Sequence, residues 1–98
     1  MEFDWHAGKA ASNLRRHGVA FAQAATVFRD PLLQSMPDED HSDVEDRRVT
    51  IGQSEDGRLL VVVHTIRHRD DQPLVRVISA RAATPRERRD FETRAMAR

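Results

Sequence analysis

Four basic side chains occupy otherwise apolar segments, where they could act on a phosphodiester. Arg47 and Arg48 begin one such segment, His64 follows the apolar run that starts at Leu59, and Arg81 ends the last one. An imidazole gives or takes a proton near neutral pH, and a guanidinium group binds phosphate through paired N–H donors. Together these groups suit RNA cleavage by the adjacent 2′-hydroxyl, with His64 as acid or base and the arginines on the phosphate. This chemistry requires no metal or other cofactor, because the nucleophile belongs to the substrate.

The same residue types also occur in strands for structural reasons. Arginines on strands often protect a sheet edge against aggregation, and a single histidine in a strand is usually packed in the core. A non-enzymatic module that binds nucleic acid or regulates a partner protein is a further alternative, and an inactive relic of an RNA-cleaving enzyme is another. Spacing alone leaves all of them open.

Charge is distributed unevenly along the chain, although its formal net charge is zero. Residues 38–46 carry six acids and no lysine or arginine, a balance of −6. Residues 47–98 carry twelve arginines against seven acids, a balance of +5. The second half is therefore a basic body suited to a polyanion, and the acids gather in one predicted loop.

Composition and missing motifs exclude several classes of protein. The 98 residues suit one domain over 1–98, and the absence of cysteine excludes disulfides and thiolate metal sites. The five histidines lack the spacing of a metal site, and there is no Gly-rich phosphate loop, nucleophile elbow or carboxylate pair. No apolar run is long enough to span a membrane and the start does not resemble a signal peptide, so we expect a cytoplasmic protein without membrane contact.

The elements that must position these groups follow from periodicity and turn residues. We predict an α+β fold, with a small antiparallel β-sheet packed against two N-terminal helices and a C-terminal helix. The expected strands are 2–5, 32–36, 45–54, 58–67 and 74–81, with turns at 55–57 and 69–73, an acidic loop at 37–44 and helices at 6–17, 20–29 and 85–97.

Side-chain patterns predict how these elements pack. In the first helix the apolar stripe is Ala7, Ala10, Ala11 and Leu14, and in the second it is Phe21, Ala24, Ala25 and Phe28. Trp5 is an expected core anchor, and the run Leu59 to Val63 predicts a central strand because it is apolar on both faces. The last helix begins with a capping box at Thr84 to Glu87 and has few apolar anchors, so we expect it to be loosely held.

A three-residue turn at Glu55-Asp56-Gly57 would place Arg48 opposite His64 across the hairpin. A two-residue turn would place Val49 there instead. Pairing beyond this hairpin cannot be counted from the sequence, so a common site for Arg47, Arg48, His64 and Arg81 is a hypothesis.

The chain resembles BrnT-type toxins over nearly its whole length. The matching segments are Phe3-Asp4-Trp5, Lys9-Ala10, His17-Gly18-Val19, Glu45-x-Arg47, Thr50-Ile51-Gly52, the segment from Gly57 to Thr65, Ile78-Ser79-Ala80-Arg81 and the Arg-Glu-Arg-Arg run at 86–89. The resemblance implies a RelE-like fold and ribosome-independent cleavage of RNA. It also implies neutralisation by a BrnA-type antitoxin, with two toxins and two antitoxins in one assembly, and contact with operator DNA only through the antitoxin.

The site residues that the resemblance implies lie within the matching segments. His64, Arg81, Arg47 and Glu45 are the catalytic candidates, and Lys9 is a candidate for substrate binding. Arg48 is a second substrate-binding candidate, although it stands where relatives often have an apolar or aromatic residue. Position 6 is often acidic in relatives and is His6 here. We expect this difference to change the cap of the first helix more than the chemistry.

Overall fold

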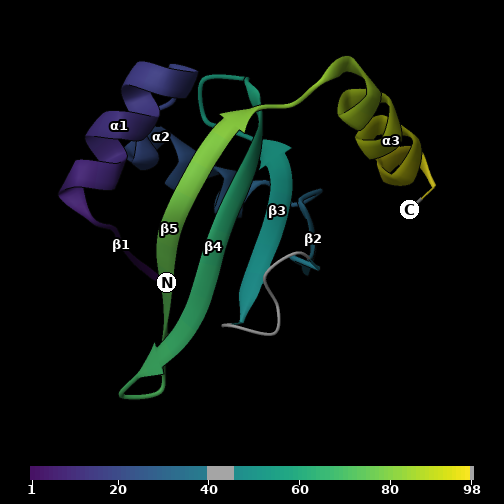
Figure 1. The fold of residues 1–98 in the computed structure, drawn as a ribbon. Coiled ribbons are helices and arrows are strands. Elements are labelled where there is room, and N and C mark those ends of the chain that lie inside the picture. The colour runs from purple at the N-terminus through teal and green to yellow at the C-terminus, as the bar shows by residue number, and fades with distance from the viewer. Residues whose placement is uncertain (40–45, 98) are drawn as a thin grey trace.

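One five-stranded sheet organises the computed structural model, which describes residues 1–39 and 46–97 (Figure 1). Along the chain the elements are β1 (Glu2–Asp4), α1 (Ala7–His17), α2 (Phe21–Ala25), the 3-10 helix η1 (Thr26–Arg29), β2 (Gln34–Pro37), β3 (Arg47–Gln53), β4 (Leu59–Arg69), β5 (Gln72–Ala82) and α3 (Pro85–Met96). The strand order is β1-β5-β4-β3-β2, and only the β1–β5 pair is parallel. The predicted α+β class and order of elements are confirmed.

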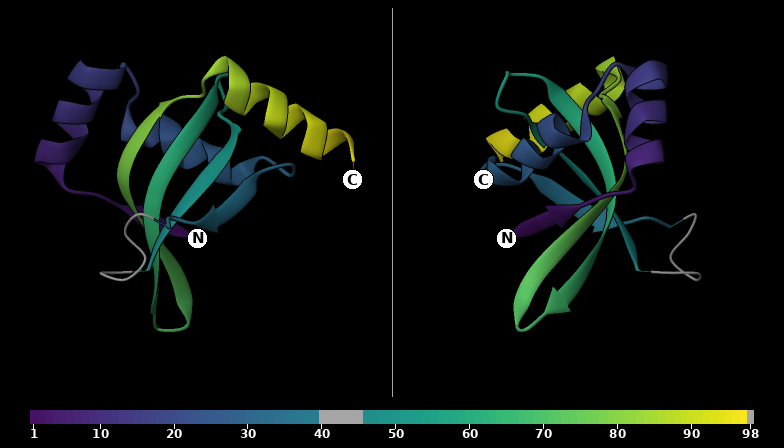
Figure 2. Two further views of the ribbon diagram at one scale, coloured as in Figure 1. Left: turned by 45° about the vertical axis from the view of Figure 1, so that its right-hand side comes forward. Right: turned by 90° about the vertical axis from the view of Figure 1, so that its left-hand side faces the viewer.

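The two faces of the sheet are covered differently. Figure 1 shows α2 and η1 behind the strands, where they bury the main core, and Figure 2 shows α3 at one end of the sheet. On the opposite side Phe91 of α3 packs on Ile51, Leu59 and Val61. We call the first side the helix-covered face and the second the open face, because α3 packs over only one end of it.

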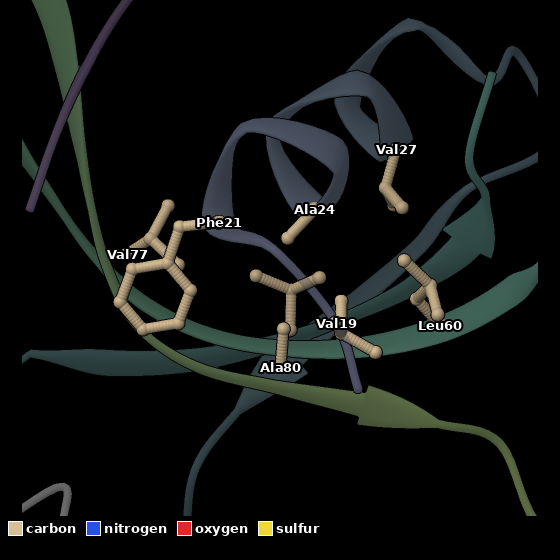
Figure 3. Packing of buried hydrophobic residues seen from close by; sticks show 8 residues of the cluster. Val19, Phe21, Ala24, Val27, Leu60, Val77 and Ala80 are labelled. Atoms are coloured by element: carbon tan, nitrogen blue, oxygen red, sulfur yellow. The ribbon is translucent and has the colours of Figure 1, made fainter. Parts of the chain in front are cut away.

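The main core joins the α2–η1 segment to the helix-covered face. Phe21, Ala24 and Val27 lie against side chains of β4 and β5, such as Leu60 and Val77 (Figure 3). The apolar face predicted for the second helix is thus largely confirmed, although the helix changes to 3-10 geometry at Thr26. Trp5 packs against this core at its border and is only partly buried.

The central position of β4 confirms the prediction from its apolar run. Its residues Leu59, Leu60, Val61 and Val62 are all buried, because α2 and η1 pack on one face and α3 on the other. A strand covered on both faces needs apolar residues at successive positions.

Turn chemistry sets the register of both long hairpins. Between β3 and β4, Ser54 N donates to Arg58 O at 2.8 Å and Gly57 has a φ of 84°, which confirms the three-residue turn and the pairing of Arg48 with His64. Between β4 and β5, Asp70 and Asp71 have φ values of 52° and 64° and form a two-residue turn. The predicted turn at 69–73 is thus tighter than expected, because both aspartates adopt the left-handed conformation that such hairpins need.

The start of β2 differs from the prediction of a strand at 32–36. Asp30 Oδ1 accepts a hydrogen bond from Leu32 N at 2.8 Å, and its Oδ2 accepts one from Gln53 N at 2.8 Å. This side chain holds Pro31 and Leu32 in a turn, so pairing with β3 begins only at Gln34. The predicted acidic loop at 37–44 lies mostly outside the described residues.

The predicted apolar stripe of α1 holds only at Ala10, which packs against the main core, because a polar side chain faces the sheet beside it. Leu14 is 52% exposed, whereas Asn13 is 6% exposed. Asn13 Nδ2 donates to Ala80 O at 2.9 Å and to Val19 O at 3.0 Å, and its Oδ1 accepts from Ala80 N at 3.1 Å. Since β1 pairs with β5 only at 74–76, the amide of Asn13 replaces a neighbouring strand at Ala80.

Replacing Asn13 by Ala should destabilise the fold strongly. The variant leaves the buried N–H and C=O of Ala80 without partners, which should cost about 3 kcal/mol of unfolding free energy in urea titrations. The exposed neighbour Ser12→Ala is the control and should change stability by less than about 0.5 kcal/mol. Equal stability of both variants would contradict the role of Asn13.

Candidate functional site

Arg47, Arg76 and Arg81 lie on the open face. One cross-strand row joins Arg76 of β5, Thr65 of β4 and Arg47 of β3, and a second row joins Arg81 to Val61 and Ile51. All three arginines are half-buried. Arg47 and Arg76 are two strands apart, about 10 Å between backbones, and Arg81 lies roughly 15 Å farther along β5 than Arg76. The open face therefore presents cations along a line that an extended polyanion could follow.

A β-bulge brings Arg81 to this face. Val77 pairs with His64 and Ser79 pairs with Val63, so Ile78 is an extra residue in β5. Side chains alternate along a strand, so without the extra residue Arg81 would point to the same side as His64. The bulge reverses the alternation and turns Arg81 to the open face.

Arg81 is held by a carboxylate from α3. Its Nη1 and Nη2 donate to Glu87 Oε1 and Oε2 at 2.7 and 2.9 Å. Glu87 Oε1 also accepts from Thr84 N, which completes the predicted capping box. Hydrogen bonding to Arg81 lowers the pKa of Glu87 to about 2 and raises the pKa of Arg81. Glu87 is thus a fixed anion that orients the guanidinium.

Lys9 lies at the edge of the open face. It lines a shallow groove between α1 and β5 together with Arg16, Ile78 and Ser79. Lys9 is exposed, and its backbone N–H donates to the His6 ring at the start of α1. Its ammonium group can therefore reach an anion that lies over the bulge in β5.

His64 and Arg48 lie on the helix-covered face. His64 is fully buried, its Nε2 is 2.7 Å from Thr50 Oγ1, and its ring meets Phe28 edge-on with centroids 4.9 Å apart. Burial, with the positive charge of Arg48 as a further cause, lowers the pKa of His64 to about 4. At neutral pH this imidazole is uncharged and packed under η1.

The hypothesis of one site for the four predicted residues is wrong. Arg47 and Arg81 share the open face, whereas Arg48 and His64 share the opposite one, because neighbours along a strand alternate and the bulge reverses β5. His64 has no exposed surface, although it lines a pocket of about 550 Å³ on the helix-covered face together with Arg48 and Thr50, so its catalytic role stays a prediction. Glu45 lies outside the described residues.

Sequence reasoning missed Arg76 and Asp4. Arg76 Nη1 lies 3.2 Å from Asp4 Oδ2, across the parallel β1–β5 pair. The signal for Arg76 was its alternation with Val75 and Val77, which placed it opposite the core face. Nothing in the sequence indicated that β1 would pair beside it.

The described residues contain neither a metal centre nor a membrane-spanning helix. Within residues 1–39 and 46–97, no group of three or more His, Asp or Glu side chains is arranged to hold a metal ion. In the same part of the chain, every helix is too short or too polar to cross a membrane.

The fold and the basic open face define a class: small α+β proteins with a sheet face suited to a polyanion. A family model described as "Ribonuclease toxin, BrnT, of type II toxin-antitoxin system" matches residues 5–87. The chain belongs to this BrnT family and is therefore a ribonuclease toxin of a type II toxin–antitoxin system.

A solved structure has the same fold. The crystal structure of the Brucella abortus ribonuclease toxin BrnT is 22% identical in sequence, with a TM-score of 0.63 over 86% of this chain and 97% of that one. No curated protein matches the chain.

The buried imidazole should make stability depend on pH. Because the pKa of folded His64 lies near 4 and its ordinary value is 6.5, the unfolded chain binds this proton first as the pH falls. The free energy of unfolding should therefore be greatest above pH 6.5 and fall by roughly 2 kcal/mol down to pH 4.5.

Urea titrations at several pH values measure this dependence. His64→Gln should remove most of it, and the exposed control His17→Gln should retain it. The same dependence in His64→Gln as in the natural chain would show that the imidazole is not buried in its neutral form.

Proposed function

We propose that this toxin cleaves RNA on the open face, by attack of a 2′-hydroxyl on the adjacent phosphodiester and without a metal ion. The observation that carries the proposal is the placement of Arg47, Arg76 and Arg81 on the side of the sheet that α2 and η1 leave uncovered. Lys9 adds a cation at its edge. Guanidinium groups there would bind the backbone and stabilise the charge that develops on phosphorus.

The arrangement supports contact with several phosphates rather than one. Arg47 and Arg76 lie in one row, and Arg81 lies farther along β5 near α3. A single-stranded RNA that crosses the strands would meet these cations in turn. Val49, Val63 and Ser79 form the row between them, over which the RNA would lie.

Neighbouring arginines on opposite faces provide a matched test. Arg47→Ala should lower RNA cleavage roughly 100-fold, because it removes a cation that stabilises the transition state. Arg48→Ala, on the helix-covered face, should change cleavage less than about threefold. Arg81→Ala should lower cleavage by a similar factor to Arg47→Ala. Cleavage by the natural chain should persist in EDTA and leave 2′,3′-cyclic phosphate ends on the products.

The assay is cleavage of a labelled RNA by purified protein, with circular dichroism as the check on folding. A larger effect of Arg48→Ala than of Arg47→Ala would place the substrate on the other face. RNA binding with a steep salt dependence but no cleavage would instead favour a non-enzymatic binding protein.

We propose further that a BrnA-type antitoxin neutralises the toxin in the cytoplasm by covering this face. Two toxins with two antitoxins are the expected assembly, with operator DNA bound through the antitoxin alone. Support comes from the groove of about 220 Å³ between α3 and the open face, whose apolar lining includes Met36, Val49, Ile51 and Phe91. Met36 is the exposed apolar side chain of this groove, and an apolar groove beside a basic surface suits a protein partner.

Substitution of Met36 tests this contact. Met36→Glu should weaken antitoxin binding about tenfold in calorimetric titrations, because it places an unpaired charge in an apolar contact. Leu32→Glu is the control, since Leu32 is 41% exposed, similar to the 38% of Met36, but does not line the groove. Equal affinities of the two variants would move the antitoxin contact elsewhere.

A further inference from the structure

A hollow at the β1 end of the open face gathers cations around one carboxylate. It has a volume of about 320 Å³ and is lined by Asp4, Arg67, His68, Arg69, Leu74 and Arg76. We call it the Asp4 hollow. Four basic side chains and a single acid make it attractive to a phosphate, and the acid adds a group that can accept a proton.

The carboxylate of Asp4 is only half satisfied. Its Oδ2 lies 3.2 Å from Arg76 Nη1, whereas its buried Oδ1 has no hydrogen-bond partner among the residues that the structure describes. The side chain as a whole is 42% exposed, and rotation about its soft Cβ–Cγ bond exchanges the two oxygens, so the acceptor can turn toward a solute. A buried acceptor without a partner is costly, and such exceptions in native folds often mark functional groups.

The position of Asp4 places this acceptor beside the proposed RNA path. Asp4 pairs in register with Arg76, which continues through Thr65 to Arg47 in the row already described. Arg67 lies two residues beyond Thr65 on β4 and pairs with Leu74, so it faces the same side. A phosphate over this row would have guanidinium groups on both sides and the carboxylate at one end.

We propose that Asp4 is the group that takes the proton from the attacking 2′-hydroxyl, while Arg67 and Arg76 bind the scissile phosphate. This inference rests on the proposed function, because it names the proton acceptor of that reaction. The bond between O2′ and phosphorus forms, and the bond between phosphorus and O5′ breaks. The proton from O2′ moves to the Asp4 carboxylate, and the departing O5′ takes a proton from water. The hydroxide ion that remains takes the proton back from Asp4, which restores the carboxylate and the water. The products are a 2′,3′-cyclic phosphate and a 5′-hydroxyl.

Two other groups suit this task less well. Both carboxylate oxygens of Glu87 already accept from Arg81, and Oε1 accepts from Thr84 N as well. His64 is fully buried on the opposite face, where it cannot meet the same phosphate. Among the described side chains of the open face, Asp4 combines an unused acceptor with cations that bind phosphate.

Asp4→Asn is the decisive variant, because it keeps the shape of the side chain and removes the proton acceptor. We expect kcat for cleavage of a short RNA to fall at least 100-fold, with KM changed less than about threefold. Asp4→Glu should restore part of the lost kcat. Asp71→Asn is the matched control and should leave kcat unchanged. This exposed acid lies in the turn between β4 and β5 and does not line the hollow.

A role limited to holding Arg76 in place predicts a different pattern. In that case Asp4→Asn would cause no further loss of kcat in an Arg76→Ala background, whereas a proton acceptor predicts an additional loss there. The absence of that loss, or a kcat within threefold in Asp4→Asn alone, would overturn the proposal. Circular dichroism checks folding, and Asp4→Ser replaces Asp4→Asn if the amide variant does not fold.

The products that the natural chain makes in EDTA distinguish a failure of the Asp4 proposal from a failure of the proposed function. If the natural chain makes cyclic phosphate ends in EDTA while Asp4→Asn is fully active, the proposed reaction stands and Asp4 is not its base. If it makes no such ends, the proposed function itself fails.

Discussion

Side-chain alternation along β3, β4 and β5 decides which basic groups share a face of the sheet. Adjacent residues on a strand point to opposite faces, so Arg47 and Arg48 are separated although they are neighbours in the sequence. The bulge at Val63/His64 then reverses β5 and brings Arg81 to the side of Arg47. The pairing register thus assembles the basic open face, and helix packing on the other side leaves that face accessible.

Packing under η1 gives the remaining polar groups a structural environment. His64 is enclosed by Phe28 and Thr50 and kept neutral by burial, with Arg48 beside it on the same face. A small domain has few buried residues, so a buried imidazole that is uncharged at neutral pH can serve as part of its core. In the proposed mechanism, stability and catalysis therefore depend on different faces of one sheet.

Much of the fold could be predicted because its signals are local. The Glu55-Asp56-Gly57 turn indicated the correct pairing of Arg48 with His64, and the apolar run at Leu59 indicated the central strand. The site was harder to predict, because a bulge in β5 and the parallel pairing of β1 depend on tertiary packing and have no local signature. The first of these separated Arg81 from His64, and the second placed Asp4 beside Arg76.

Binding of an RNA to the open face can be followed through the side-chain NMR signals of the arginines. A short oligonucleotide with 2′-O-methyl groups cannot supply the nucleophile, so it can be titrated while nitrogen–proton NMR spectra are recorded. The Nε–Hε signals of Arg47, Arg76 and Arg81 should shift strongly, with little change at Arg48. Shifts confined to Arg48 and its neighbours on the helix-covered face would contradict the account.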